Sequence, residues 1–259
     1  MMKMKSASLT AFKLIGMLVL VAAVVFGFAA CAQPTSLWKA DLSQDGVFNT
    51  NSGSAEQPYG SVTKNADGTV TLKGSAANVT GELWSANTYF GETDKNFDYT
   101  NGMSISYTVN IDPATMKEGK HSVWSLALNG TNGAYLTELP TYFLGTENGV
   151  KFVYQFAGVD ARGDVITNTK AYTITQKGSY TVSYKLTTAQ NDEMNVQVTL
   201  KDANSKTVYA SDAETFKVID NEGATAGTIV KTDMIKGLRY LWLCRTNVDV
   251  TVSSVEITK

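Results

Sequence analysis

The sequence predicts an all-β protein, an antiparallel β-sandwich made of two sheets. Apolar and polar residues alternate with a period of two in several segments, as in strands that bury one face and expose the other. Asp-Gly and Asn-Gly pairs lie between strand-like segments, where they suit hairpin turns. Such segments recur about every 10 to 15 residues, which is typical of a sandwich or barrel rather than of alternating β and α units.

The chain begins with a segment typical of a signal peptide. Residues 1–13 carry Lys3, Lys5 and Lys13 and no acid, and residues 14–30 carry no charge at all. A basic start, an apolar run and small residues before a cut are the parts of a secretory signal. We therefore expect residues 1–30 to be removed.

Cys31 follows this segment in "FAAC", which resembles the bacterial lipobox. That family usually has Leu where this chain has Phe28. The resemblance implies a diacylated Cys31 that anchors the protein to a membrane of the cell envelope, with residues 31–36 as a short tether. An alternative cut after "ACA" would leave Gln33 first and release a soluble secreted or periplasmic protein.

The first mature segments are strand-like. "SLWKADL" opens the mature region, and Asp67-Gly68 in "KNADGTV" predicts a hairpin turn. Further along, Asn148-Gly149 and Asn204-Ser205 predict two more turns. Helix signals are few, and residues 232–237 are the best of them.

Three segments in the middle of the chain alternate most clearly. Their apolar residues predict the buried face of a sheet. These residues are Met103, Ile105, Tyr107, Val109 and Ile111; Tyr180, Val182, Tyr184 and Leu186; and Met194, Val196, Val198 and Leu200.

The C-terminal segment holds two apolar runs separated by "RTN". In the first run, residues 240–244, alternation places Tyr240, Trp242 and Cys244 on one face and two leucines on the other. A strand that is apolar on both faces lies in the middle of a covered sheet or lines a ligand groove.

The second apolar run predicts a β-bulge. Val248, Val250 and Val252 share one face, but Val255 and Ile257 join them only after a one-residue shift. We therefore expect the bulge at Ser253-Ser254.

With no repeat and no internal linker, residues 37–259 are expected to form one domain.

The order of these segments resembles that of concanavalin A-like and laminin-G-like jelly rolls. The segments are "LWKADLS", "HSVWSLAL", "GVKFVYQFAG", "GSYTVSYKLT", "MNVQVTLKDANSKTVYAS" and "NVDVTVSSVEI". The resemblance covers most of residues 36–259. It implies a glycan-binding domain, often with a structural calcium ion, and some relatives are glycan-cleaving enzymes.

Catalytic patterns are scarce. A glycosidase needs two carboxylates about 5 to 10 Å apart, and the acids here do not form the Glu-x-Asp-x-Glu run of the glucanase relatives. The single histidine, His121, excludes a multi-histidine metal site and argues against a histidine-based triad, and we interpret it as a solvated residue at the start of a strand.

Aromatic residues are the best candidates for contact with a sugar, because sugars stack their C–H faces on aromatic rings. Trp124 alternates with leucines and is expected in the core. The candidate ligand-binding residues are Trp84, Asn87, Tyr89, Tyr240 and Trp242.

Charged residues restrict the possible partners. Loss of three lysines with residues 1–30 lowers the net charge from −2 to −5, which argues against binding to nucleic acid. The run Asp94-x-Asn96-x-Asp98 is rich in oxygen ligands and is the candidate calcium site, although Asp and Asn also serve turns.

These observations favour a lipid-anchored envelope protein that binds a carbohydrate or another extracellular ligand without cleaving it. Two alternatives stay open. One is a glycan-cleaving enzyme of the same fold, either a hydrolase or a lyase. The other is a structural or adhesive surface protein, for which we expect a flat sheet and an exposed apolar patch.

Overall fold

The computed structural model describes residues 34–44, 48–49, 62–74, 87–89, 102–129, 135–154, 170–188, 193–219, 228–230 and 240–259. The chain divides into two compact units, Met1–Thr35 and Ser36–Lys259, and every described strand belongs to the second. Within the ranges given above, no helix has the length and hydropathy that a membrane crossing requires.

One sheet has ten described strands, with a main path of β15-β14-β12-β11-β6-β17-β4-β3. β1 joins it at β17, and β13 joins it at β12. Neighbouring strands are antiparallel, except β14 and β15, which are parallel. The strands are β1 (Ser36–Lys39), β3 (Val62–Lys64), β4 (Val70–Leu72), β6 (Met103–Ile111), β11 (Gly178–Thr188), β12 (Glu193–Lys201), β13 (Thr207–Ala210), β14 (Glu214–Ile219), β15 (Thr228–Val230) and β17 (Val250–Thr258).

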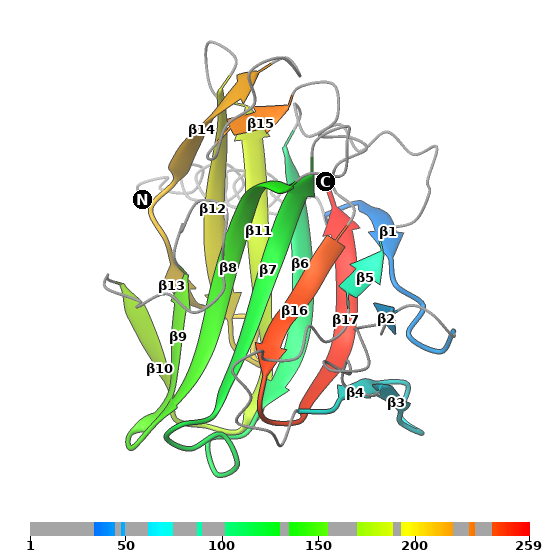
Figure 1. The fold of residues 1–259 in the computed structure, drawn as a ribbon, viewed down its shortest axis with the longest axis vertical. Coiled ribbons are helices and arrows are strands. Elements are labelled where there is room, and N and C mark those ends of the chain that lie inside the picture. The colour runs from blue at the N-terminus through cyan, green and yellow to red at the C-terminus, as the bar shows by residue number, and fades with distance from the viewer. Residues whose placement is uncertain are drawn as a thin grey trace, which may run out of the picture. The chain divides into compact units, whose positions relative to one another are not determined.

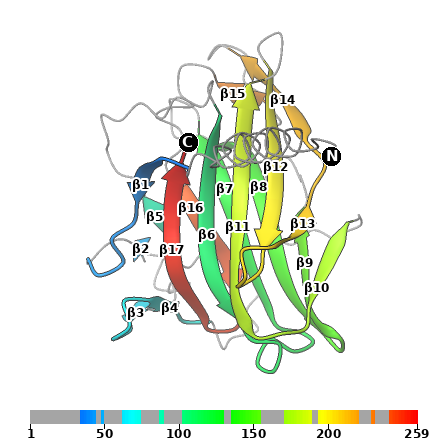
Figure 2. The ribbon, with the colours of Figure 1, turned by 180° about the vertical axis from the view of Figure 1, so that it is seen from behind.

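The other sheet has seven described strands in the order β10-β9-β8-β7-β16-β5-β2, all antiparallel. Figure 1 is viewed from the side of this sheet, and Figure 2 from the side of the ten-stranded sheet. Its strands are β2 (Phe48–Asn49), β5 (Asn87–Tyr89), β7 (His121–Asn129), β8 (Tyr135–Thr146), β9 (Gly149–Tyr154), β10 (Ala171–Ile174) and β16 (Tyr240–Thr246).

The chain passes repeatedly from one sheet to the other. β6 lies in the ten-stranded sheet, and β7 to β10 lie in the seven-stranded sheet. The chain then returns to the ten-stranded sheet for β11 to β15, crosses to the seven-stranded sheet for β16, and ends in the ten-stranded sheet with β17. The predicted fold class, a two-sheet antiparallel β-sandwich of the jelly-roll kind, is confirmed.

The core lies between the two sheets and contains the predicted faces of β6, β11 and β12. All thirteen residues predicted from alternation there are at most 5% exposed. Trp124 of β7 is fully buried and stacks on Tyr107 of β6, with ring centroids 4.6 Å apart. Its predicted role in the core is therefore confirmed.

The predicted bulge in β17 is also confirmed. Its register with β6 shifts between Val252 and Ser254, so that Ser253 is the extra residue. Because of this shift, Val255 and Ile257 are buried on the same face as Val252.

The three predicted turns are present. Gly68 and Ser205 have positive φ angles of 81° and 61°. At the third turn, Thr146 pairs with Gly149, so Glu147 and Asn148 occupy the tip. The prediction was one residue late there, because Gly149 begins β9 with a φ of 129°.

Candidate functional site

The seven-stranded sheet has an inner face toward the core and an outer face turned away from it. Trp124 and Leu126 of β7 belong to the core cluster, so they mark the inner face. Successive residues of a strand alternate between faces. Val123 and Ser125 therefore belong to the outer face.

Strand pairing brings four of the five predicted ligand-binding residues together. In the pairing of β5 with β16, Tyr89 lies opposite Tyr240 and Asn87 lies opposite Trp242. Residues directly opposite each other in an antiparallel pair share a face. The sequence suggested two separate aromatic groups, and the register places them at one location.

The pairing of β16 with β7 identifies that face. Leu241 lies opposite Leu126, and Leu243 lies opposite Trp124, so both leucines occupy inner-face positions. Tyr240 and Trp242 therefore occupy outer-face positions. Since β16 is paired on both edges, by β5 and β7, the prediction of a strand inside a sheet is confirmed.

The same rows continue across the outer face. Across the strands, the position of Trp242 is next to Ser125 of β7, which is next to Pro140 of β8. Tyr240 is followed by Ala127 of β7 and Glu138 of β8. One acidic position thus shares a row with the aromatic positions, which the scattered acids of the sequence did not indicate.

A bulge in β16 corrects one detail of the predicted alternation. The register with β7 shifts between Leu243 and Arg245, so Arg245 rather than Cys244 lies opposite Val123. Strict alternation therefore ends at Leu243. The shift adds a basic position to the row that Val123 shares with Tyr142 of β8.

The middle of the outer face is shielded from solvent. Val123, Ser125, Tyr142 and Val153 are 4%, 0%, 6% and 0% exposed, although the apolar and aromatic residues among them lie outside the core cluster. An adhesive protein with a flat, exposed apolar sheet would leave such residues open to solvent. The described part of this face does not have that character.

Ser125 carries a polar group that is unsatisfied within the described chain. Its Oγ is buried and has no hydrogen-bond partner there. Unpaired buried hydroxyls are uncommon in folded proteins because desolvation costs free energy that a hydrogen bond normally offsets. The group lies in the row of Trp242.

His121 begins β7 as predicted, but it is not a fully solvated residue. Its Nε2 atom is buried. It lies opposite Leu144 and two residues before Val123, which places it on the outer face. The interpretation of a solvated histidine was therefore wrong for the ring nitrogen.

Several predicted residues lie outside the described part of the chain. These are Cys31, Trp84, Asp94, Asn96 and Asp98. Within the described part, no group of three or more His, Cys, Asp or Glu side chains is arranged to hold a metal ion. The calcium site therefore stays a prediction.

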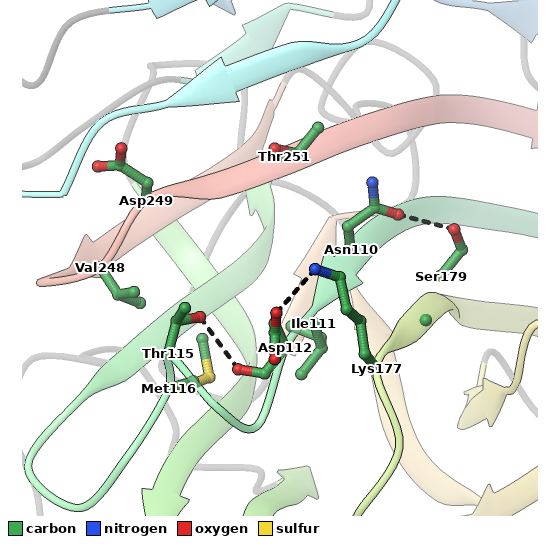
Figure 3. A pocket seen from close by; sticks show the side chains of 11 residues that line it. Asn110, Ile111, Asp112, Thr115, Met116, Lys177, Ser179, Val248, Asp249 and Thr251 are labelled. Carbon is green, nitrogen blue, oxygen red and sulfur yellow. Dashed lines mark hydrogen bonds and ion pairs between the residues drawn. The ribbon is translucent and has the colours of Figure 1, made fainter.

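The structure also contains a pocket that the sequence did not indicate. It has a volume of about 440 Å³ and lies where β6 ends and where β11 and β17 begin (Figure 3). Some of its polar residues, such as Asp112 and Thr115, come from a turn, and others, such as Asn110 and Ser179, come from the exposed faces of strand ends; polar residues are common at both kinds of place for local reasons. No spacing in the sequence therefore distinguished them.

No protein-family model and no curated protein match the chain. Several solved structures are similar to it. The CBM2 module of the evolved Dit of Lactobacillus casei BL23 phage J-1 is 11% identical, with a TM-score of 0.46 and coverage of 87% of this chain and 95% of that one.

Two lyases are similar to a comparable degree. Alginate lyase Aly36B is 16% identical, with a TM-score of 0.43 and coverage of 88% and 97%. The endo-β-1,4-glucuronan lyase of Trichoderma reesei is 9% identical, with a TM-score of 0.47 and coverage of 87% and 96%. At these TM-scores and identities, none of the three supports the assignment of a function or a site residue.

Proposed function

We propose that this protein binds a carbohydrate on the outer face of its seven-stranded sheet, where β5 pairs with β16. The observation that carries the proposal is the register that places Tyr89 opposite Tyr240 and Asn87 opposite Trp242. Three aromatic positions and one amide position thus occupy four adjacent places on one face.

This composition suits a sugar. Aromatic rings accept the apolar C–H faces of a pyranose ring, and amide and hydroxyl groups bind its hydroxyls.

The test is a glycan array probed with the mature protein, followed by calorimetric titration of the best glycan. Trp242→Ala is expected to weaken binding at least about tenfold, because it removes a stacking surface. Trp84→Ala tests the fifth predicted residue in the same way.

Trp38→Ala is the matched control. Trp38 packs against the core from the ten-stranded sheet, so its loss is expected to lower thermal stability and leave affinity unchanged. Unchanged affinity in both Trp84→Ala and Trp242→Ala, with both variants folded, would remove the proposed site.

A second candidate function is cleavage of an acidic glycan by a lyase reaction. It is favoured by the row of Arg245, Val123 and Tyr142 on the outer face. Arg245 and Tyr142 lie on either side of Val123 in this row, at a distance on the order of 10 Å. Because Tyr142 is 6% exposed, this candidate also requires that the face opens to the substrate.

In that reaction a base removes the proton next to the sugar carboxylate, and a carbon–carbon double bond forms. The glycosidic carbon–oxygen bond then breaks, and the leaving oxygen receives a proton. Tyr142 would transfer protons, and Arg245 would balance the carboxylate charge.

Ultraviolet absorbance of the unsaturated product tests the lyase candidate on alginate, glucuronan and pectate. Activity that is lost in Tyr142→Phe with the fold intact would support it. Absence of product from all three glycans would leave binding without cleavage as the function of the site.

We further propose that the protein is a bacterial envelope lipoprotein anchored at Cys31. The support lies in the sequence, in the uncharged run that ends in "FAAC". Mass spectrometry of the mature N-terminus is expected to find an acylated Cys31. A chain that begins at Gln33 would contradict the anchor and indicate a soluble secreted or periplasmic protein.

A further inference from the structure

We propose that the pocket in Figure 3 is a second binding site, for an uncharged ligand rich in hydroxyl groups such as a sugar ring. We call it the turn pocket. The proposal does not rest on the site at β5 and β16, because none of the turn-pocket residues belongs to the outer face of the seven-stranded sheet. Its polar lining consists mainly of Asn110, Asp112, Thr115, Ser179, Asp249 and Thr251.

Three connections form its walls. They are the turn between β6 and β7, the entry into β11, and the turn between β16 and β17. In the first, the carbonyl of Asp112 accepts hydrogen bonds from the N–H groups of Thr115 and Met116, at 3.0 and 2.9 Å. The side-chain Oδ1 of Asp112 also accepts a hydrogen bond from the N–H of Ala114, at 2.9 Å. This wall is therefore fixed before a ligand arrives.

Close backbone packing holds two of the walls in place. A Cβ atom at Gly145 would lie 2.8 Å from the carbonyl oxygen of Met116, and a Cβ atom at Gly74 would lie 2.4 Å from the backbone nitrogen of Val248. Only glycine allows such approaches. Both turns therefore lie directly against neighbouring backbone, and the pocket is a rigid feature of the fold.

Asn110 presents a defined pair of donors. Its Oδ1 accepts a hydrogen bond from the Ser179 hydroxyl, at 2.7 Å. That bond orients the amide, so its two N–H donors stay available to a ligand oxygen. Figure 3 shows the Asn110 nitrogen on the side opposite the Ser179 bond.

Each carboxylate of the pocket is balanced by a lysine. Lys177 Nζ lies 2.8 Å from Asp112 Oδ2, and Lys73 Nζ lies 2.6 Å from Asp249 Oδ2. The lining is thus close to neutral, so neither an anion nor a cation gains a net attraction. Carboxylate oxygens nevertheless remain strong acceptors for the hydroxyl groups of an uncharged ligand.

A small apolar surface completes the lining. Ile111, Met116 and Val248 border the pocket, but Ile111 and Met116 are core residues that are 1% and 3% exposed, so the half-buried Val248 presents most of that surface. A sugar ring combines hydroxyl groups at its rim with an apolar C–H face, and this lining offers a partner for each. A volume of about 440 Å³ lies within the range of small-ligand sites.

The experiment is an NMR titration of the ¹⁵N-labelled mature protein with glucose, galactose, mannose and xylose, and with sodium glucuronate as the charged comparison. The backbone amides of Asn110, Thr115, Ser179 and Asp249 are expected to shift with at least one neutral sugar. Glucuronate is expected to bind at least about tenfold more weakly than that sugar, because the lining offers no uncompensated positive charge.

Asn110→Asp is the test variant, because it keeps the acceptor for Ser179 and removes both donors. It is expected to weaken binding at least about tenfold. Asn195→Asp is the matched control, since Asn195 Oδ1 accepts a bond from the Thr215 hydroxyl at 2.8 Å outside the pocket. It is expected to bind as the unchanged protein does.

The outcomes separate this site from the one at β5 and β16. Trp242→Ala is expected to leave the pocket shifts unchanged. The proposal is overturned if no neutral sugar shifts these amides, if Asn110→Asp binds like the unchanged protein, or if glucuronate binds more tightly than every neutral sugar.

Discussion

Thr141 shows how one side chain joins the two sheets. It lies on β8 and is fully buried. Its Oγ1 lies 2.7 Å from Tyr107 Oη and 3.1 Å from Tyr184 Oη, and both tyrosines belong to the ten-stranded sheet. Tyr184 Oη also donates to the carbonyl of Leu139, at 2.9 Å. This polar cluster fixes the relative position of β6, β8 and β11 inside an otherwise apolar core.

Two tyrosine hydroxyls in the core are expected to respond oppositely to removal. Tyr184→Phe loses the hydroxyl's bonds with Thr141 and with the Leu139 carbonyl, so the free energy of unfolding should fall by about 1–3 kcal/mol. The Tyr154 hydroxyl is buried without a partner in the described chain, and burial raises its pKa. Tyr154→Phe should therefore leave stability unchanged or raise it. Urea unfolding of both variants checks this, and a larger loss in Tyr154→Phe would contradict it.

Two carboxyls of the turn pocket are held in their charged form. The hydrogen bond from Lys177, followed by that from the Ala114 N–H, lowers the pKa of Asp112. For Asp249, burial acts to raise the pKa, but the bonds from Lys73 and the Gly74 N–H outweigh it, and the net pKa is lowered. Each folded-state pKa thus lies below the unfolded value of about 3.9.

This sets the sign of a pH dependence. A carboxyl whose pKa is lowered on folding stabilises the protein above its unfolded pKa, and that contribution disappears as the pH falls through the folded pKa. We expect the double variant Asp112→Asn with Asp249→Asn to be less stable than the unchanged protein at pH 7. The difference in stability should shrink below about pH 4. Thermal unfolding across this range measures it, and a constant difference would contradict the assignment.

At the scale of single elements, β17 and β16 show how much a strand pattern can predict. The bulge at Ser253 was predictable because Val255 and Ile257 break the alternation of Val250 and Val252. The bulge before Arg245 was not, because residues 240–244 are apolar on both faces and give no break to detect. A strand whose sequence is apolar on both faces gives no pattern from which its register can be read.

Gly145 links two elements that alternation describes separately. It lies in β8, and a Cβ atom there would overlap the carbonyl oxygen of Lys117 in the turn after β6. The Gly145 N–H also donates to the carbonyl of Lys120, at 2.7 Å. The turn therefore packs backbone against backbone at this point.

Gly145→Ala is accordingly expected to lower the free energy of unfolding by about 1–3 kcal/mol, because the turn must move away. Gly178→Ala serves as the comparison, since its Cβ would lie 3.6 Å from the Ala203 Cβ, an ordinary contact. Differential scanning calorimetry of both variants tests this. If Gly145→Ala and Gly178→Ala melted at the same temperature, the close packing of the turn against Gly145 would not contribute to stability, and the prediction would be wrong.

At the scale of the whole molecule, the fold class followed from local signals. Alternation, turn residues and strand spacing each have a short range, and together they predicted a two-sheet sandwich. The candidate site depends on long-range pairing instead. Tyr89 and Tyr240 are adjacent only because β16 lies between β7 and β5, and no local pattern specifies such a neighbour.

The turn pocket could not be predicted from the sequence for a related reason. Asn110, Ser179 and Thr251 come from three strands that are adjacent only in the folded sheet. Separately, each is a polar residue on the exposed face of a strand. These three residues are neighbours only because β6 lies between β11 and β17 in the sheet.

The central claim is that β5 and β16 together present one carbohydrate site on the outer face. A crystal structure of the mature protein with the best glycan from the array tests it most directly. The account predicts a sugar ring beside Trp242 and Tyr240, within reach of Asn87 and Tyr89. A well-ordered glycan bound anywhere else, with this face free, would contradict it.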